Sequence, residues 1–289
     1  RPFPHIDGIR AITHNGGCGG TAQDAWTLCR MLAAYADHPN VAGLTVFSLG
    51  CEKAQIGLFQ EALRERNLGF DKPCILLRQQ DWSSEVKMME EAVRKTLAHF
   101  KNADLVERRP VPLSKLKLGV KCGGSDGFSG ITANPLVGLF SDWLIAQGGT
   151  TVLTEVPEMF GAETILMNRS ESKAVFEKTV HLINDFKSYF IENKQPIYEN
   201  PSPGNKAGGI STLEEKSLGC TQKAGTSAVR DVMLYGEQLK TKGLNLLSAP
   251  GNDLVASTAL ASSGCHLVLF TTGRGTPFGT FVPTVKVST

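Results

Sequence analysis

The strongest constraint on the fold is an alternation of strand-like and helix-like patterns along the first hundred residues. Apolar runs over 8–14, 42–49 and 73–78 predict strands, and amphipathic patterns predict helices between and after them, over 21–37, 54–67 and 82–102. Strands that alternate with helices usually form a parallel sheet covered by those helices. The sequence therefore predicts an α/β fold made of parallel-sheet βαβ units.

A charged stretch, VERRPVPLSK at 106–115, interrupts this alternation. It contains two prolines and no apolar period, so it predicts a domain boundary. The alternation then resumes, which gives two Rossmann-like domains. The later elements that we expect are strands at 116–120 and 150–156, a helix capped by Thr132, a helix over about 171–193, a long loop over 196–228, a helix over 229–240, and finally the strand LNLLSA, the helix DLVASTALASS and the strand HLVLFTT.

Composition excludes several classes of protein. The 289 residues are 41% hydrophobic, which is enough for a large core. The net charge is +2, and no cluster of Lys and Arg is interleaved with aromatic residues, so no nucleic-acid partner is expected. No apolar run reaches the roughly 18 residues of a membrane span, and the opening RPFPHIDGIR has no signal-peptide pattern. The odd number of seven cysteines in so large a chain favours a reducing, cytoplasmic setting.

The loop KCGGSDGFSGITANP at 121–135 lies between a predicted strand and a predicted helix. It brings the thiol of Cys122, the carboxylate of Asp126 and glycine backbone amides to a helix N-terminus, a combination that suits an anion or a metal. A plain tight turn is the alternative.

Other strand ends carry further reactive side chains. THNGGCGG contributes His14 and Cys18, LGCEKAQ contributes Cys51 and Glu52, and TEVPEMFGAE contributes Glu158. Ligands of open α/β sheets collect at such ends, and thiolate, imidazole and carboxylate together suit iron or zinc. The absence of any Cys-x-x-Cys pair excludes zinc-ribbon and ferredoxin spacings, which leaves a mononuclear metal, a cluster with one open iron, or thiols that are only packed.

Two cations lie in loops suited to an acidic substrate. PGNKAGG surrounds Lys206 with glycines and Asn205, and Arg274 follows the strand LVLFTT. Lys206 could bind a carboxylate or act as a base, and Arg274 could bind a carboxylate through its planar fork. A solvated lysine and a surface arginine are the alternatives.

Long blocks of this sequence resemble the altronate and galactarate dehydratase family of sugar-acid lyases, in the family's order: CGGSDGFSGITANP, TEVPEMFGAE, NPSPGNKAGGISTLEEKSLGCTQKAG, APGNDLV and LFTTGRGTPFGTFVPTVKV. The resemblance covers almost the whole chain, and the second and third blocks resemble the altronate branch. It implies a middle domain over 1–108 and a C-terminal catalytic domain over 109–289, both incomplete. A further N-terminal domain of the full-length protein is then expected as a partner, and a homo-oligomer is left open.

The resemblance implies iron-dependent dehydration of D-altronate to 2-dehydro-3-deoxy-D-gluconate, with Fe²⁺ or an iron–sulfur cluster as cofactor and Mn²⁺ as the alternative metal. Such chemistry needs a metal or cations that bind the substrate carboxylate, a base at C2 and an acid for the departing 3-hydroxyl. The implied roles are catalysis by His14, Lys206 and Glu158, substrate binding by Gly123, Gly124, Ser125, Asp126, Asn205 and Arg274, and metal binding by Cys18, Cys51, Cys122 and Glu52.

Three other functions stay open at this point. The same chemistry could act on galactarate or a sulfonated hydroxy acid. A non-catalytic module that binds sugar acids or serves assembly is a different class. A nucleotide-dependent oxidoreductase is less favoured, since no G-x-G-x-x-G follows the first predicted strand.

Overall fold

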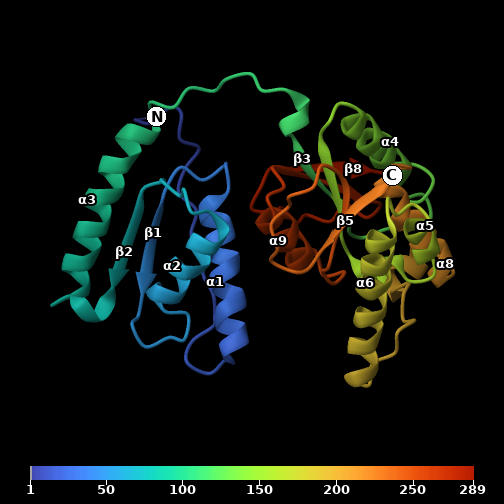
Figure 1. The fold of residues 1–289 in the computed structure, drawn as a ribbon, viewed down its shortest axis with the longest axis horizontal. Coiled ribbons are helices and arrows are strands. Elements are labelled where there is room, and N and C mark those ends of the chain that lie inside the picture. Colours follow the sequence, from blue (N-terminus) through green and yellow to red (C-terminus); the bar gives the residue numbers. More distant parts are fainter. Residues whose placement is uncertain (1) are drawn as a thin grey trace. The chain divides into compact units, whose positions relative to one another are not determined.

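The computed structural model describes residues 2–289, which divide between Pro110 and Val111 into two compact units (Figure 1). The elements of the first unit are α1 (Ala22–Asp37), β1 (Leu44–Ser48), α2 (Ile56–Arg66), β2 (Cys74–Arg78), a short 3₁₀ helix (Gln79–Asp81) and α3 (Glu85–Ala103).

Strands β1 and β2 of the first unit form a two-stranded parallel sheet, with Leu44 opposite Cys74. Helices α1 and α2 pack together through a small apolar cluster that includes Cys29 and Phe59. Helix α1 begins at a reciprocal cap, in which the Thr21 side chain accepts from the backbone of Asp24 and the Asp24 carboxylate accepts from the backbone of Thr21.

The strand expected over residues 8–14 is absent, and this prediction was wrong. The segment is irregular, and the side chains of Ile9 and Ile12 are 68% and 42% exposed. Its apolar side chains therefore have no core to pack against, and no described strand pairs with it. Cys18 consequently does not stand at the end of a strand, whereas Cys51 follows β1 and Cys122 is the last residue of its strand.

The second unit contains one six-stranded sheet, in which every pair of neighbouring strands is parallel. Its order is β5-β6-β4-β3-β7-β8. The strands are β3 (Lys117–Cys122), β4 (Thr150–Leu153), β5 (Val229–Met233), β6 (Gly243–Leu247), β7 (Leu267–Thr272) and β8 (Thr284–Ser288). The helices are α4 (Ala133–Ala146), α5 (Glu163–Met167), α6 (Lys173–Glu192), α7 (Pro203–Ala207), α8 (Leu213–Thr221) and α9 (Asp253–Ser263), with 3₁₀ turns at Leu113–Lys115, Val156–Met159 and Gln222–Ala224.

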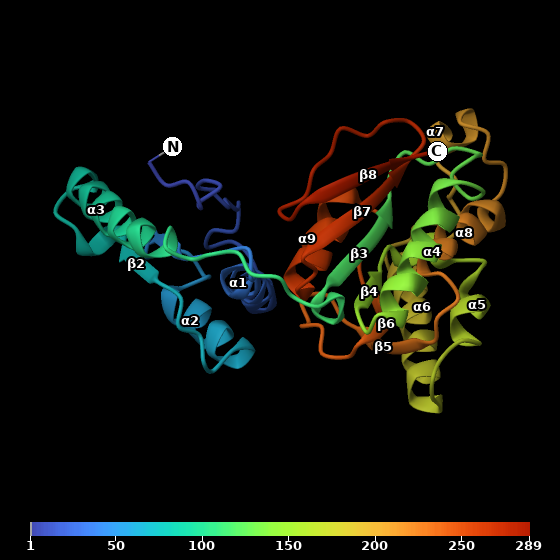
Figure 2. The ribbon, with the colours of Figure 1, turned by 90° about the horizontal axis from the view of Figure 1, so that it is seen from above.

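Helices cover both faces of this sheet, with α4 and α6 on one side and α9 on the other (Figure 2). The central strands β4 and β6 are buried along their whole length, as expected for parallel strands covered on both faces. The main core joins Leu118 and Val120 of β3 to Val137 of α4 and Leu182 of α6. The predicted α/β class with parallel sheets is therefore confirmed.

Several local predictions for the second unit were wrong. Residues 229–233 form β5 instead of the start of a helix, since Val229 and Met233 are buried and the strand pairs with β6. The expected long loop over 196–228 contains α7 and α8, and the strand β8 was not anticipated. Thr132 occupies the cap position of α4, but its hydroxyl donates to the carbonyl oxygen of Phe128 instead of capping the helix.

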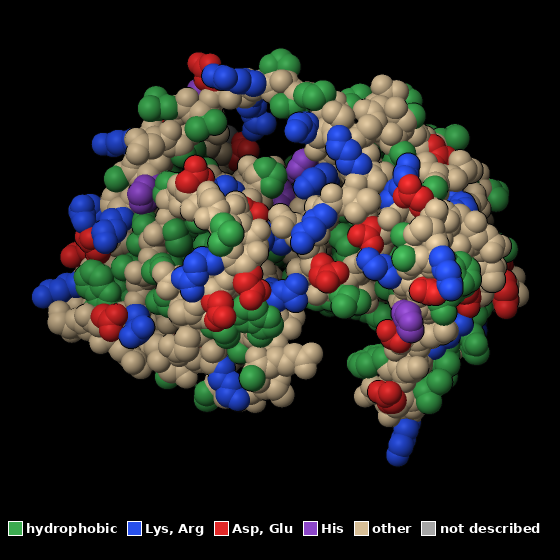
Figure 3. Space-filling view, viewed as in Figure 1, with side chains coloured by type: hydrophobic (Ala, Val, Ile, Leu, Met, Phe, Trp, Pro, Cys, Tyr) green, Lys and Arg blue, Asp and Glu red, His purple; other side chains and the backbone are tan. Residues whose placement is uncertain are grey.

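Lys/Arg and Asp/Glu side chains are interspersed on the face shown in Figure 3. Within residues 2–289, no helix is both long and apolar enough to cross a bilayer.

Candidate functional site

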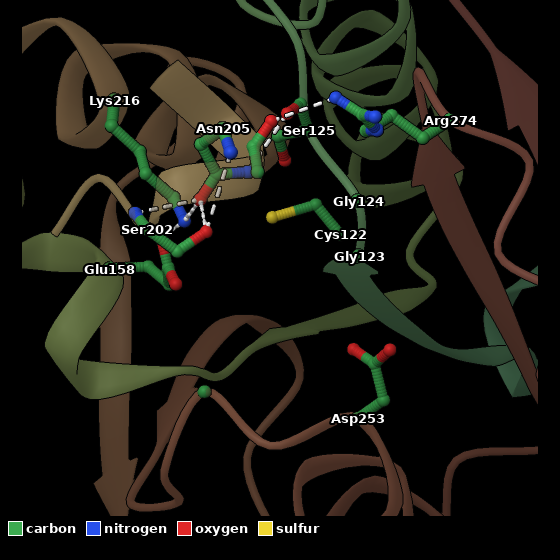
Figure 4. Close-up of a pocket in the computed structure, with 12 residues that line it drawn as sticks. Cys122, Gly123, Gly124, Ser125, Glu158, Ser202, Asn205, Lys216, Asp253 and Arg274 are labelled. Atoms are coloured by element: carbon green, nitrogen blue, oxygen red, sulfur yellow. Dashed lines mark hydrogen bonds and ion pairs between the residues drawn. The ribbon is translucent and has the colours of Figure 1, made fainter. Parts of the chain in front are cut away.

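A cavity of about 190 Å³ lies at the carboxyl ends of the strands in the second unit (Figure 4). Parallel sheets usually bind ligands at this edge. The cavity is smaller than the roughly 300 Å³ at which drug-sized ligand sites begin, so it suits a small polar molecule rather than a dinucleotide. It is lined by the loops after β3, β4, β6 and β7 and by α7 and α8, through Cys122, Gly123, Gly124, Ser125, Glu158, Ser202, Gly204, Asn205, Lys216, Gly251, Asp253 and Arg274.

The glycine loop after β3 forms one wall of the cavity. Gly124 has a φ of +63°, which a side chain would strain, and the Gly123 amide donates to the carbonyl oxygen of Thr271. The amides of Gly124 and Ser125 make no hydrogen bond to any other described residue. Two backbone donors in the cavity lining are thus available to a ligand oxygen.

A methyl group on Gly123 should disturb this wall, because its Cβ would lie 2.5 Å from Cζ of Phe270 and 2.8 Å from Oδ1 of Asp253. We expect Gly123→Ala to lower the free energy of unfolding by about 1–3 kcal/mol, the usual cost of overpacking. Urea denaturation measures this change. Gly204→Ala is the control, since its Cβ would meet no atom within 4 Å; equal midpoints for the two variants would contradict the prediction.

An ion pair between Lys216 and Glu158 forms the opposite wall (Figure 4). Lys216 Nζ lies 3.1 Å from Glu158 Oε2 and donates to Asn205 Oδ1 at 2.8 Å. Asn205 in turn donates from Nδ2 to the carbonyl oxygen of Ser125, so it connects this wall to the glycine loop. Burial opposes the charge of Lys216, but the nearby Glu158 and Cys220 raise its pKa, which keeps its ammonium group charged at neutral pH.

A buried charge network supports the floor of the cavity. Glu155 is 1% exposed and lies between two lysines with no exposed surface: its Oε1 is 3.1 Å from Lys121 Nζ and its Oε2 is 3.2 Å from Lys223 Nζ. Lys121 also pairs with Asp253 at 2.6 Å. Burial raises the pKa of Glu155, but the two lysines and the backbone amide of Cys122 outweigh burial and lower it, so Glu155 is ionised.

Two thiols adjoin this network. Cys122 Sγ and Cys220 Sγ are 3.5 Å apart, Lys223 Nζ donates to Cys122 Sγ at 2.9 Å, and Cys220 Sγ donates to Glu158 Oε2 at 3.5 Å. The hydrogen bond between the thiols lowers the pKa of Cys122 and raises that of Cys220 well above its ordinary value, and Lys223 also favours the Cys122 thiolate. In Figure 4 the Cys122 sulfur points toward the group formed by Asn205, Ser202 and Glu158.

Most of the substrate-binding residues expected from the sequence line this cavity, namely Gly123, Gly124, Ser125, Asn205 and Arg274, and the expected catalytic Glu158 lines it as well. Arg274 donates from Nη1 to the carbonyl oxygen of Gly204 at 2.9 Å.

Two of the expected residues lie elsewhere. Asp126 is not part of the lining; its carboxylate accepts from the backbone amides of Phe128 and Ser129 and from the Thr289 hydroxyl, so it orders the loop. Lys206 is exposed in α7 and outside the lining.

The remaining expected residues belong to the first unit. His14, Cys18 and Cys51 are exposed, and Glu52 is buried, where its Oε1 accepts a hydrogen bond from the Ser48 hydroxyl. The loops that carry them meet through a hydrogen bond from the Lys53 amide to the carbonyl oxygen of Gly17.

The residues that the family resemblance assigns to iron are divided between the two units. Within residues 2–289, no group of three or more His, Cys, Asp and Glu side chains is arranged to hold a metal ion. Cys18 lies in the loop before α1, whereas Cys51 and Glu52 lie in the loop after β1. Oε2 of Glu52 is buried without a hydrogen-bond partner among the described residues. Cys122 lies in the second unit against the Lys223 ammonium group.

Sequence reasoning missed several residues of this site, among them Lys216, Cys220, Lys223 and Asp253. A signal for three of them exists in KSLGCTQK, where positions 216, 220 and 223 follow the i, i+4, i+7 spacing of one helix face. The expectation of a loop over this segment concealed that periodicity.

Comparison with known protein families gives two matches that together cover most of the chain. Residues 2–104 match the family described as D-galactarate dehydratase/altronate hydrolase, second domain, and residues 113–289 match D-galactarate/altronate dehydratase, C-terminal.

Individual relatives share high identity over nearly the whole chain. This chain is 60% identical over 284 residues to the altronate dehydratase of Bacillus subtilis (strain 168). It is 55% identical over 286 residues to the altronate dehydratase of Escherichia coli (strain K12). Each alignment covers 98% of this chain and 56% of the relative. The galactarate dehydratase (L-threo-forming) of E. coli is 34% identical over 256 residues, covering 87% of this chain and 49% of that protein. The chain thus spans about half the length of these relatives.

Proposed function

Because this chain belongs to the galactarate and altronate dehydratase family, we propose that it carries the dehydration site of a hydro-lyase that converts D-altronate to 2-dehydro-3-deoxy-D-gluconate and water. The observation that carries the proposal is the Lys216–Glu158 pair, which faces the glycine loop across a small polar cavity. Altronate is favoured over galactarate because the altronate dehydratases share 55–60% identity with this chain, against 34% for the galactarate enzyme.

Removal of a proton next to a carboxylate builds up negative charge on that carboxylate, so the site must supply cationic or hydrogen-bonding groups there. Arg274 and the unpaired amides of Gly124 and Ser125 are suited to this task, since they line the same cavity. A guanidinium group can hold both carboxylate oxygens at once. We therefore assign the substrate carboxylate to the side of the cavity formed by the glycine loop and Arg274.

The opposite wall then contains the groups that move protons. Glu158 is assigned as the base that takes the proton from C2, and Lys216 as the acid that donates a proton to the departing 3-hydroxyl. The C3–O bond breaks as the C2–C3 double bond forms, water leaves, and the resulting enol becomes the 2-keto product. Asn205 positions Lys216, because it holds the ammonium group through Oδ1 and the glycine loop through Nδ2.

Iron dependence and a cytoplasmic location stay predictions. Neither is needed for the assignments above, which use only side chains and amides of the second unit.

Turnover of D-altronate and galactarate by the full-length protein, with and without added Fe²⁺ or Mn²⁺, tests the proposal. We expect a 2-keto-3-deoxy acid to form from altronate with the higher kcat/KM. Binding of altronate without turnover under every condition would instead favour a non-catalytic sugar-acid-binding protein.

A further inference from the structure

Cys122, which lines the cavity described above, and Cys220, which lines a second one, are arranged as a reactive pair. Cys122 and Cys220 are 98 positions apart in sequence, yet their sulfurs are 3.5 Å apart, and neither is in a disulfide. A disulfide needs a sulfur–sulfur distance of about 2.05 Å, so the sulfurs must approach by about 1.5 Å. Cys122 is the last residue of the central strand β3, whereas Cys220 lies in the last turn of α8, so a shift of that helix end could supply part of the approach.

Both sulfurs can be reached by a small oxidant. Cys122 lines the cavity described above, and Cys220 lines a second cavity of about 170 Å³, bounded by Ser129, Ile131 and Ile210, on the side of α8. Lys223, with no exposed surface, donates to Cys122 Sγ at 2.9 Å. The ammonium group thus lies beside the Cys122 sulfur, and Glu155 Oε2 lies 3.7 Å from the same sulfur.

We propose that Cys122 and Cys220 form an oxidation site, at which a peroxide converts the two thiols into a disulfide. The Cys122 sulfur attacks one peroxide oxygen, the O–O bond breaks, and a sulfenic acid forms with release of the first water. The Cys220 sulfur then attacks the Cys122 sulfur, the S–O bond breaks, and the second water leaves. Two thiols and one hydrogen peroxide thus give one disulfide and two waters, and a dithiol reductant reverses the change.

Oxidation should also stop dehydration, a consequence that rests on the proposed function. The Cys220 thiol, which donates to Glu158 Oε2, would lose its proton, and the Cys122 sulfur would move toward α8. Lys223 would lose its contact with the Cys122 sulfur, while Glu155 would still hold it through Oε2. The surroundings of the assigned base would therefore change while the strand core stayed in place.

Hydrogen peroxide treatment of the full-length protein, followed by alkylation and peptide mass spectrometry, tests the proposal. We expect a dithiothreitol-sensitive peptide pair that joins Cys122 to Cys220. Cys220→Ser should abolish this cross-link, whereas Cys265→Ser, at another buried cysteine, should leave it unchanged. Circular dichroism checks that both variants fold.

The cross-link in the unmodified protein is decisive without any variant. If Cys122 and Cys220 are still alkylated as thiols after the exposed Cys18 and Cys51 have been oxidised, the proposal is wrong. Activity is measured in parallel: a cross-link without loss of turnover would overturn only the effect on dehydration. Absence of altronate turnover before oxidation would refute the proposed function and leave the cross-link measurement valid.

Discussion

Lys216→Met should lower kcat/KM for D-altronate by a factor of about 10²–10³, the usual cost of removing one group that stabilises charge or moves a proton in a transition state. Methionine keeps much of the length of lysine but cannot donate a proton or hold Glu158, whose Oε2 lies 3.1 Å from the ammonium group. Steady-state kinetics on the full-length protein measure the change. Because Lys216 is assigned to the chemical step, most of the loss should appear in kcat.

The matched control for this variant is Lys206→Met. Lys206 lies ten positions earlier, exposed and outside the cavity lining, and has the same charge. We expect its kcat to stay within about twofold of the unmodified protein, since surface substitutions away from a site have little effect. Equal losses in the two variants, or a loss only in Lys206→Met, would return the catalytic role to the lysine that the sequence suggested.

The parallel α/β class could be predicted because buried strands and amphipathic helices have different hydrophobic periods. Residues 8–14 show where this reasoning fails. Their sequence has the pattern of a strand, and sequence alone does not tell whether a neighbouring strand is present to pair with it. Residues 229–233 show the reverse error, since their burial beside β6 decides their conformation, and that burial depends on the fold as a whole.

The part of the candidate site that could be located from the sequence lies in one short block. The glycine loop could be identified because strand, glycines and helix follow one another in the sequence. Lys223 and Cys220 could not be connected with Cys122 in this way, since they are about a hundred positions away. Only the tertiary fold brings the end of α8 and the 3₁₀ turn after it next to the end of β3. Lys206 attracted attention through its glycine-rich neighbours, whereas burial distinguishes Lys216, and burial is a tertiary property.

Lys223→Met should destabilise the second unit by about 3–5 kcal/mol, the usual cost of breaking a buried ion pair by removal of one partner. Methionine fills much of the space but leaves Glu155, which is 1% exposed, with Lys121 as its remaining ammonium partner. Urea unfolding at pH 7 measures the change.

The pKa shifts support pH 7 as the condition for this measurement. The pKa of Glu155 is lowered in the folded protein. Its contribution to the free energy of unfolding is therefore fully present above pH 4.5, the ordinary pKa of the group, and is lost as the pH falls through the folded-state pKa. Burial lowers the pKa of Lys223, but Cys122 and Glu155 outweigh burial and raise it. Its contribution to the free energy of unfolding is therefore fully present below pH 10.5, the ordinary pKa of the group, and is lost only as the pH rises through the folded-state pKa. Both contributions are therefore fully present at neutral pH.

Two controls separate the buried pair from a general effect of removing a lysine. Lys173→Met removes one partner of an exposed i,i+4 pair with Glu177, so it should change the unfolding midpoint little. In Lys223→Met the buried Glu155 carboxylate has lost one ammonium partner, and adding Glu155→Gln removes that carboxylate. The loss of stability in the double variant should therefore be smaller than the sum of the losses in the two single variants. Strict additivity, or equal midpoints for the Lys223 and Lys173 variants, would show that the network contributes no more than a surface ion pair.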